Sequence, residues 1–83
     1  MRVRLSLAAV EQVLALPTAT RTRVVAVFRR LREWPAVSGV KALSGPLAGE
    51  YRVRTGDYRV QFRIEGDQVI VVKVGHRDGF YDA

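Results

Sequence analysis

Hydrophobic and polar residues alternate with a period of two through residues 50–77, which predicts β-strands, because successive side chains leave opposite faces of a strand. Gly-Asp pairs at Gly56 and Gly66 interrupt the alternation, and glycine supplies the positive φ that tight hairpin turns need. The predicted strands of this antiparallel meander are residues 50–55, 57–65 and 68–77. The third strand begins with the apolar run Val69–Val72, so it is expected inside the sheet and covered on both faces over part of its length.

The N-terminal half begins with alternation and continues with helical periodicity. Residues 1–5 predict a short first strand, after which Ser6 is expected to cap a helix that ends at Pro17. The apolar face of this helix is predicted to consist of Leu7, Val10 and Leu14.

A second helix follows, with Thr18 or Thr20 as the expected N-cap and Pro35 as its end. Its apolar positions are Val24, Val27, Phe28, Leu31 and Trp34. Its other side carries Arg21, Arg23, Arg29, Arg30 and Arg32, which we interpret as a solvated face that can also help to steer an anionic partner. The two helices are expected to lie as a hairpin across the apolar face of the sheet. The prediction is a single domain over residues 1–83, of the α+β class, in the order β-α-α-β-β-β.

Residues 35–49 form a connection rich in glycine and proline, expected to have no regular structure. Val40 and Leu43 are expected to attach it to the core, and Lys41 between them to point toward the polar face of the sheet.

That polar face is predicted to be basic. In-register hairpins collect on it Arg52, Arg54, Arg59, Gln61, Arg63, Lys73 and Arg77. Like charges opposite each other across strands destabilise a sheet by up to about 1 kcal/mol per pair. Two interpretations remain open: the face meets a polyanion, or carboxylates lie between the arginines while the arginine stems cover apolar surface.

Composition narrows the possible chemistry. The chain has 83 residues, a net charge of +6 and no cysteine, which excludes disulfides, cysteine-ligated zinc and thiol catalysis and is compatible with the cytoplasm. No apolar run is long enough to span a membrane. Basic residues dominate residues 1–49, whereas the acids of residues 50–83 lie mostly at turns and ends, so nucleic acid or an acidic protein is the expected partner.

Metal-free RNA cleavage needs only positioning, charge stabilisation and proton transfer, because the ribose 2′-hydroxyl is the nucleophile. His76 and Tyr81 are the candidate proton-transfer groups. His76 is also in phase with Ile70, Val72 and Val74, so it could instead be a buried core histidine. Tyr81 and Phe80 could instead be an aromatic plug over the core.

Several motifs resemble the RelE/ParE superfamily of toxins from toxin–antitoxin systems. They are Lys41-Ala42-Leu43, Gly49 to Arg54, Gly56 to Val60, and Gly75-His76-Arg77 followed by Tyr81. The resemblance implies a cytoplasmic toxin that cleaves mRNA in the ribosomal A site without metal or cofactor and is inhibited by a partly disordered, acidic antitoxin.

The resemblance also implies roles for individual residues. Arg52 and Arg54 would hold RNA phosphates, at positions where RelE enzymes carry lysines, together with Lys41, Arg63 and Lys73 of the basic face. Arg59 and Arg77 would stabilise the scissile phosphate. Tyr81 would stack on a base or help to deprotonate the 2′-hydroxyl, with His76 sharing the proton transfer. Two alternatives stay open: a ParE-like inhibitor of DNA gyrase without nuclease activity, and a non-toxic basic binding module.

Overall fold

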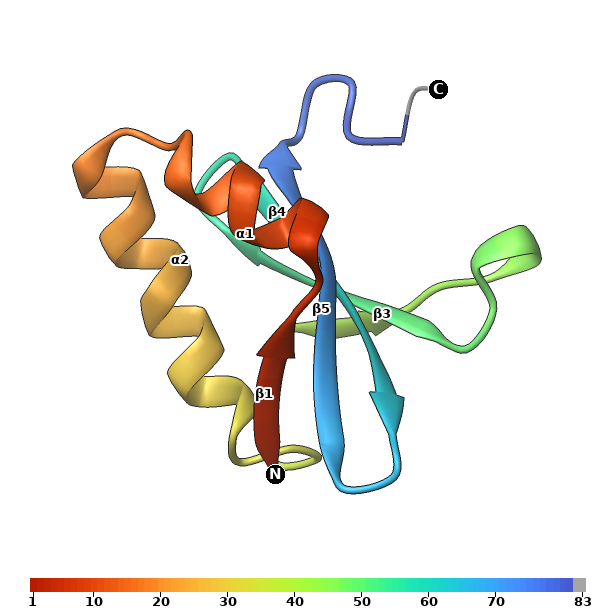
Figure 1. Cartoon of the computed structure of the whole chain (residues 1–83). Coiled ribbons are helices and arrows are strands. Elements are labelled where there is room, and N and C mark those ends of the chain that lie inside the picture. Colours follow the sequence, from red (N-terminus) through yellow and green to blue (C-terminus); the bar gives the residue numbers. More distant parts are fainter. Residues whose placement is uncertain (82–83) are drawn as a thin grey trace.

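The computed structural model describes residues 1–81 and shows two helices packed on one face of a single five-stranded sheet (Figure 1). The elements are β1 (Arg2–Leu5), α1 (Leu7–Leu14), α2 (Thr18–Leu31), β2 (Val40–Ala42), the 3₁₀ turn η1 (Gly45–Leu47), β3 (Glu50–Thr55), β4 (Tyr58–Glu65) and β5 (Gln68–His76). The α+β class and the order of the predicted elements are therefore confirmed. No helix within residues 1–81 is long and apolar enough to cross a membrane.

The sheet has the strand order β1-β5-β4-β3-β2, with β1 parallel to β5 and every other pair antiparallel. The two predicted hairpins are present, and Gly56 and Gly66 adopt the positive φ angles of 57° and 59° that these turns require. Strand β5 has β1 on one side and β4 on the other, so its predicted place inside the sheet is confirmed.

The core lies between the sheet and the two helices. Its buried members are Ala9, Val13, Val24, Val27, Leu31, Val53, Val60, Phe62, Val69, Val71 and Val74. Trp34 extends it beyond the end of α2, with its ring centroid 4.8 Å from Tyr51 and 5.4 Å from Phe62. Burial of these side chains fixes the face that the helices cover and leaves the opposite face of the sheet open.

A β-bulge breaks the alternation in β5. Gln61 pairs with Lys73 whereas Phe62 pairs with Val71, so Val72 is an extra residue. The predicted common phase of Ile70, Val72, Val74 and His76 is therefore wrong: Ile70 lies on the open face, opposite Arg63. Two side chains from the region of α1 form hydrogen bonds with backbone groups at the bulge. The Ser6 hydroxyl donates to the Val72 carbonyl (3.3 Å), and Gln12 Oε1 accepts the Val74 N–H (2.7 Å).

The two helices differ from the predictions in the face that α1 buries and in where the helices begin and end. Ser6 does cap α1, accepting the Ala9 N–H at 3.1 Å, but the predicted apolar face is wrong. The helix buries Ala9 and Val13 and leaves Leu7, Val10 and Leu14 exposed at 76%, 37% and 64%. A small residue lets this short helix approach the sheet closely, so the larger leucines stay outside. Pro17, not a threonine, occupies the N-cap position of α2, which ends at Leu31.

The connection over residues 35–49 is more ordered than predicted. Residues Val40–Ala42 form β2, an edge strand antiparallel to β3, and Gly45–Leu47 form a 3₁₀ turn. Val40 packs against the core as predicted, whereas Leu43 is only half-buried. Three residues are too few to show a period, so the sequence pattern gave no sign of this strand.

Candidate nucleic-acid interface

The register between strands determines which polar side chains are neighbours on the open face. One cross-strand row contains Lys41, Arg52, Gln61 and Lys73, and the next contains Arg54, Arg59 and Gly75. We call this side of the sheet the basic face; its cations are Lys41, Arg52, Arg54, Arg59, Arg63 and Lys73. The alternation in the sequence predicted this common face.

Arg59 lies at the centre of the positive charge. Its direct cross-strand partner is Arg54, and no carboxylate of residues 1–81 forms an ion pair with either residue. Partial burial, and then the positive charges of Arg52, Arg54 and Arg77, lower the pKa of Arg59 below the usual arginine range, while the Tyr81 phenol acts in the opposite direction. Arg59 still carries its charge near neutral pH, and that charge lies in a repulsive environment that a bound anion would relieve.

Arg52 shows the same imbalance in the neighbouring row. Its Nε is buried and has no hydrogen-bond partner in the described part of the chain. The carboxylate of Glu50 is close by in sequence, but it accepts a hydrogen bond from Gln61 Nε2 at 2.7 Å, and the Gln61 side chain is buried. Glu50 is the first residue of the predicted strand 50–55, one of the acids expected at strand ends, and its pairing with Gln61 depends on a strand register that the sequence alone does not show.

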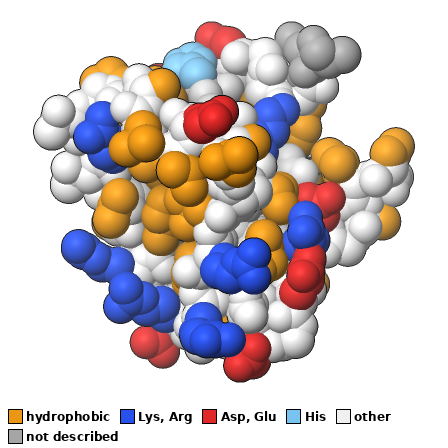
Figure 2. Space-filling model, viewed as in Figure 1, with side chains coloured by type: hydrophobic (Ala, Val, Ile, Leu, Met, Phe, Trp, Pro, Cys, Tyr) orange, Lys and Arg blue, Asp and Glu red, His pale blue; other side chains and the backbone are white. Residues whose placement is uncertain are grey.

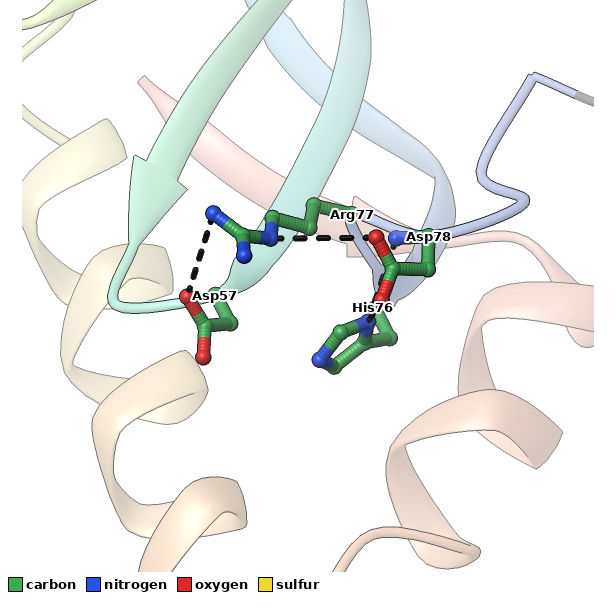
Figure 3. A network of polar contacts seen from close by, with 4 residues as sticks. All are labelled: Asp57, His76, Arg77 and Asp78. Carbon is green, nitrogen blue, oxygen red and sulfur yellow. Dashed lines mark hydrogen bonds and ion pairs between the residues drawn. The ribbon is translucent and has the colours of Figure 1, made fainter.

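Arg77 follows β5 and is held at the β3–β4 turn. Its backbone N–H donates to the Asp57 carbonyl at 2.7 Å. The guanidinium lies 3.8 Å from Asp57 Oδ1 and 3.8 Å from Asp78 Oδ1, with all three side chains exposed (Figure 3). Such exposed, long ion pairs contribute about 0–1 kcal/mol, so the guanidinium is free to exchange these carboxylates for a phosphate.

His76 is exposed rather than buried, so the interpretation as a core histidine is wrong. Its cross-strand partner is Tyr58, whose ring it meets edge to face at 5.3 Å, and Tyr58 is in phase with the core residues Val60 and Phe62. The imidazole Nδ1 accepts the backbone N–H of Asp78 at 3.1 Å (Figure 3). His76 thus lies at the rim of the helix side of the sheet, and the structure does not bring it together with Arg54 and Arg59.

The C-terminal segment, residues 77–81, folds back over the basic face. Phe80 is buried there against Gly75, where an added Cβ would come within 3.2 Å of the Phe80 ring. The Lys73 ammonium donates to the Phe80 carbonyl and lies 4.5 Å from the centroid of the Phe80 ring. Tyr81, 49% exposed, meets Phe80 edge to face at 4.9 Å. The predicted aromatic plug exists in Phe80, but it covers the open face and not the core between helices and sheet.

The candidate residues therefore divide into groups. Arg54 and Arg59 are cross-strand partners, Arg52 lies in the next row, and Arg77 is close enough to act on the pKa of Arg59; we call these four residues the arginine cluster, and Tyr81 lies beside it. Lys41 lies exposed on the edge strand, Lys73 binds the C-terminal segment, and Arg63 forms an ion pair with Glu65. Residues 1–81 contain no group of three histidine, cysteine, aspartate or glutamate side chains placed to hold a metal ion.

The chain is similar in sequence to one protein family and in fold to several solved structures. The family described as ParE toxin of type II toxin-antitoxin system, parDE, matches residues 3–79. The toxin–antitoxin complex RelBE2 from Mycobacterium tuberculosis is 28% identical with a TM-score of 0.80, over 92% of this chain and 96% of that one. The archaeal RelE–RelB complex from Pyrococcus horikoshii is also 28% identical, with a TM-score of 0.71 over 92% and 93% of the two chains.

The isolated RelE toxin of E. coli has the same fold, with a TM-score of 0.75 over 90% of this chain and 82% of that one, at 18% identity. No curated protein sequence matches the chain significantly.

Proposed function

The chain belongs to the ParE toxin family of type II toxin–antitoxin systems, within the RelE/ParE superfamily, and from this premise we propose that it is a ribosome-dependent mRNA endonuclease. The observation that supports this function is the arginine cluster, in which Arg54 and Arg59 are neighbours without a carboxylate partner in residues 1–81. Cations that the fold already holds close together stabilise the negative charge that develops on a bound phosphate in the transition state, because they need not move during the reaction.

The proposed reaction uses the substrate's own nucleophile. The ribose 2′-oxygen attacks the adjacent phosphorus, the bond from phosphorus to the 5′-oxygen breaks, and the products carry a 2′,3′-cyclic phosphate and a 5′-hydroxyl. One proton leaves the 2′-hydroxyl and one reaches the leaving oxygen. The protein supplies orientation and positive charge, and no step is assigned to a metal ion or cofactor.

Residue roles follow from position in the cluster. Arg59 and Arg77 are proposed to hold the scissile phosphate, since Arg59 is central and the ion pairs of Arg77 are loose. Arg52, Arg54 and Lys41 are proposed to bind the flanking phosphates along the rows of the sheet. Tyr81, exposed beside the cluster, is proposed to stack on a base or to accept the 2′ proton.

A cognate antitoxin is the proposed regulator of this toxin in the cytoplasm. The relative from M. tuberculosis is described as a toxin–antitoxin complex, and the one from P. horikoshii as a complex of RelE with RelB. An acidic segment that becomes ordered over the basic face would neutralise the arginine cluster and block access to RNA.

The match to the ParE toxin family favours one second candidate, inhibition of DNA gyrase without RNA cleavage. The deciding experiment incubates the purified protein with translating ribosomes and maps mRNA 5′ ends, beside a gyrase supercoiling assay. Codon-phased 5′ ends that disappear with Arg59→Ala and Arg77→Ala support the nuclease. Loss of supercoiling with intact mRNA supports the gyrase inhibitor, and neither effect indicates a non-toxic binding module.

A further inference from the structure

Glu50 lies between two arginines on the basic face. Its direct cross-strand partner is Arg63, and Arg52 is two residues further along β3, on the same side of the sheet. Residues two apart on a strand are separated by about 6.6 Å, a distance that a glutamate and an arginine side chain together span easily. In Figure 2 Asp and Glu side chains are seen next to Lys and Arg side chains in the region of β3 and β4. An ion pair between Glu50 and Arg52 is therefore the arrangement to expect.

That ion pair does not form in the described part of the chain. Gln61, the direct cross-strand partner of Arg52, instead donates from its Nε2 to Glu50 Oε1 at 2.7 Å. Gln61 is only 6% exposed, so this hydrogen bond is largely shielded from water. A hydrogen bond to a carboxylate is charge-assisted, and a low local dielectric strengthens it. Gln61 thus occupies the carboxylate that would otherwise neutralise Arg52.

Arg52 in turn keeps its capacity to bind an anion. Its Nε is buried without a hydrogen-bond partner in residues 1–81, and no ion pair within those residues involves its guanidinium. A guanidinium presents a fork of N–H donors that matches a carboxylate and a phosphate equally well. A pair with Glu50 would use the same donors and cancel the charge. Binding of a phosphate by Arg52 therefore requires that Glu50 be held by another group.

We propose that Gln61 is a positioning residue for RNA binding, because its hydrogen bond to Glu50 keeps that carboxylate from Arg52 and leaves Arg52 available to a phosphate. This inference rests on the proposed function, in which Arg52 binds a phosphate beside the scissile one. Gln61 acts through Arg52 and not on the reacting atoms, so it governs the affinity for RNA and not the chemical step. A Gln61 that only stabilised the sheet would have effects independent of Glu50.

The first test needs no RNA. Gln61→Met keeps the length of the side chain but cannot donate a hydrogen bond, so a crystal structure of this variant should show a Glu50 oxygen within about 4 Å of the Arg52 guanidinium. Gln61→Asn keeps an amide on a side chain one carbon shorter, and it should give the same pair if Gln61→Met does not fold. A Glu50 carboxylate that stays away from Arg52 in the variant would overturn the inference.

The second test measures cleavage of ribosome-bound mRNA. Gln61→Met should raise KM about fivefold and leave kcat within about twofold, because the lost phosphate contact is shared by the ground state and the transition state. Adding Glu50→Gln should restore KM, since a neutral amide does not neutralise Arg52. Arg52→Gln should raise KM by itself, and Gln61→Met should add nothing to it.

Gln68→Met is the matched control. It makes the same change on the same face of the sheet, opposite Glu65, at a side chain whose Oε1 has no hydrogen-bond partner within residues 1–81. It should leave KM unchanged, because no carboxylate is released.

Four kinetic results would show that Gln61 stabilises the sheet without controlling Arg52, and each would overturn the inference. They are a rise in KM that Glu50→Gln does not reverse, an equal fall in kcat, additive effects of Gln61→Met and Arg52→Gln, and an equal rise in KM for Gln68→Met. Absence of cleavage by the parent protein would contradict the proposed function alone. The distance between Glu50 and Arg52 in Gln61→Met would then still decide whether Gln61 holds the carboxylate away.

Discussion

Arg54 on β3 and Arg59 on β4 are direct cross-strand partners, and neither forms an ion pair with a carboxylate of residues 1–81. Two like charges in this position cost up to about 1 kcal/mol of sheet stability. The acids close to them in the sequence have other partners: Asp57 pairs with Arg77, Glu50 binds Gln61, and Glu65 binds Arg63. The open face thus keeps uncompensated charge at its centre, which is the arrangement expected of a surface that meets an anion.

Arg59→Gln should separate stability from activity. Removing the charge relieves the repulsion from Arg54, so the free energy of unfolding should stay constant or rise by up to about 1 kcal/mol. Loss of a cation at the developing phosphate charge should lower RNA cleavage by at least about a hundredfold. Urea unfolding and quantified 5′ ends on ribosome-bound mRNA measure the two effects.

The matched control is Arg63→Gln, on the same strand and face but paired with Glu65. Because both of these side chains are exposed, the variant should change stability by less than about 1 kcal/mol and keep nearly full cleavage. Equal loss of cleavage in both variants would mean that total positive charge matters and not the cluster around Arg59.

Tyr81 offers a choice between stacking and proton transfer. Tyr81→Phe keeps the ring and removes the hydroxyl, whereas Tyr81→Ala removes both. If the ring stacks on a base, Phe should retain most of the cleavage and Ala should lose affinity by about 1–3 kcal/mol. If the hydroxyl takes the proton, both variants should lose cleavage by about a hundredfold or more at saturating ribosome complex.

His76→Gln tests whether this histidine takes part in the reaction. The ring pairs with Tyr58 at the rim of the helix side, away from Arg54 and Arg59. We therefore expect cleavage rates of His76→Gln within about threefold of the parent protein, because a proton-transfer group must lie within hydrogen-bond reach of the phosphate position proposed at Arg59, and His76 lies on the other side of the sheet. A large drop in rate with unchanged ribosome binding would restore His76 to the reacting groups.

The alternation of residues 50–77 was sufficient to predict the meander and the basic face, because hairpin turns fix the register of antiparallel strands. It was not sufficient for β5, where the bulge at Val72 depends on Ser6 and Gln12, more than sixty residues away in sequence. The same limit explains α1. A periodic pattern identifies the most hydrophobic side of a helix, but Ala9 is buried because of close packing on the sheet, and Leu7 and Leu14 stay outside.

The arginine cluster was predicted in its members but not in its arrangement. Alternation placed Arg52, Arg54 and Arg59 on one face, whereas the position of Tyr81 depends on Phe80 and Lys73. A glycine at position 75, directly opposite Arg59, was the signal that could have shown where the C-terminal segment docks, because glycine in a strand often marks a close approach.

Ser6→Ala should destabilise the fold, because the hydroxyl both caps α1 and donates to the bulge carbonyl of Val72. A cost of about 1–2 kcal/mol in the free energy of unfolding is expected. Thr18→Ala is the control, since the exposed Thr18 begins α2 without a side-chain cap. Its effect should be below about 0.5 kcal/mol. Equal costs would show that propensity and not capping decides the two helix starts.

Phe80 holds the C-terminal segment, residues 77–81, on the sheet and thereby positions Tyr81 next to the arginine cluster. Its ring is buried on Gly75, its carbonyl accepts from Lys73, and its neighbour Tyr81 lies beside the arginine cluster. Phe80→Ala should therefore cost about 3–5 kcal/mol and release residues 77–81, which lowers cleavage although every residue of the arginine cluster is retained. Gly75→Ala should act in the same direction but more weakly, because the Phe80 ring need move only slightly.

The control for Phe80→Ala is Leu14→Ala, which truncates a side chain that is 64% exposed and should change neither the free energy of unfolding nor RNA cleavage. Full cleavage by Phe80→Ala, with fast amide exchange across residues 77–81, would show that Tyr81 acts without being held on the sheet.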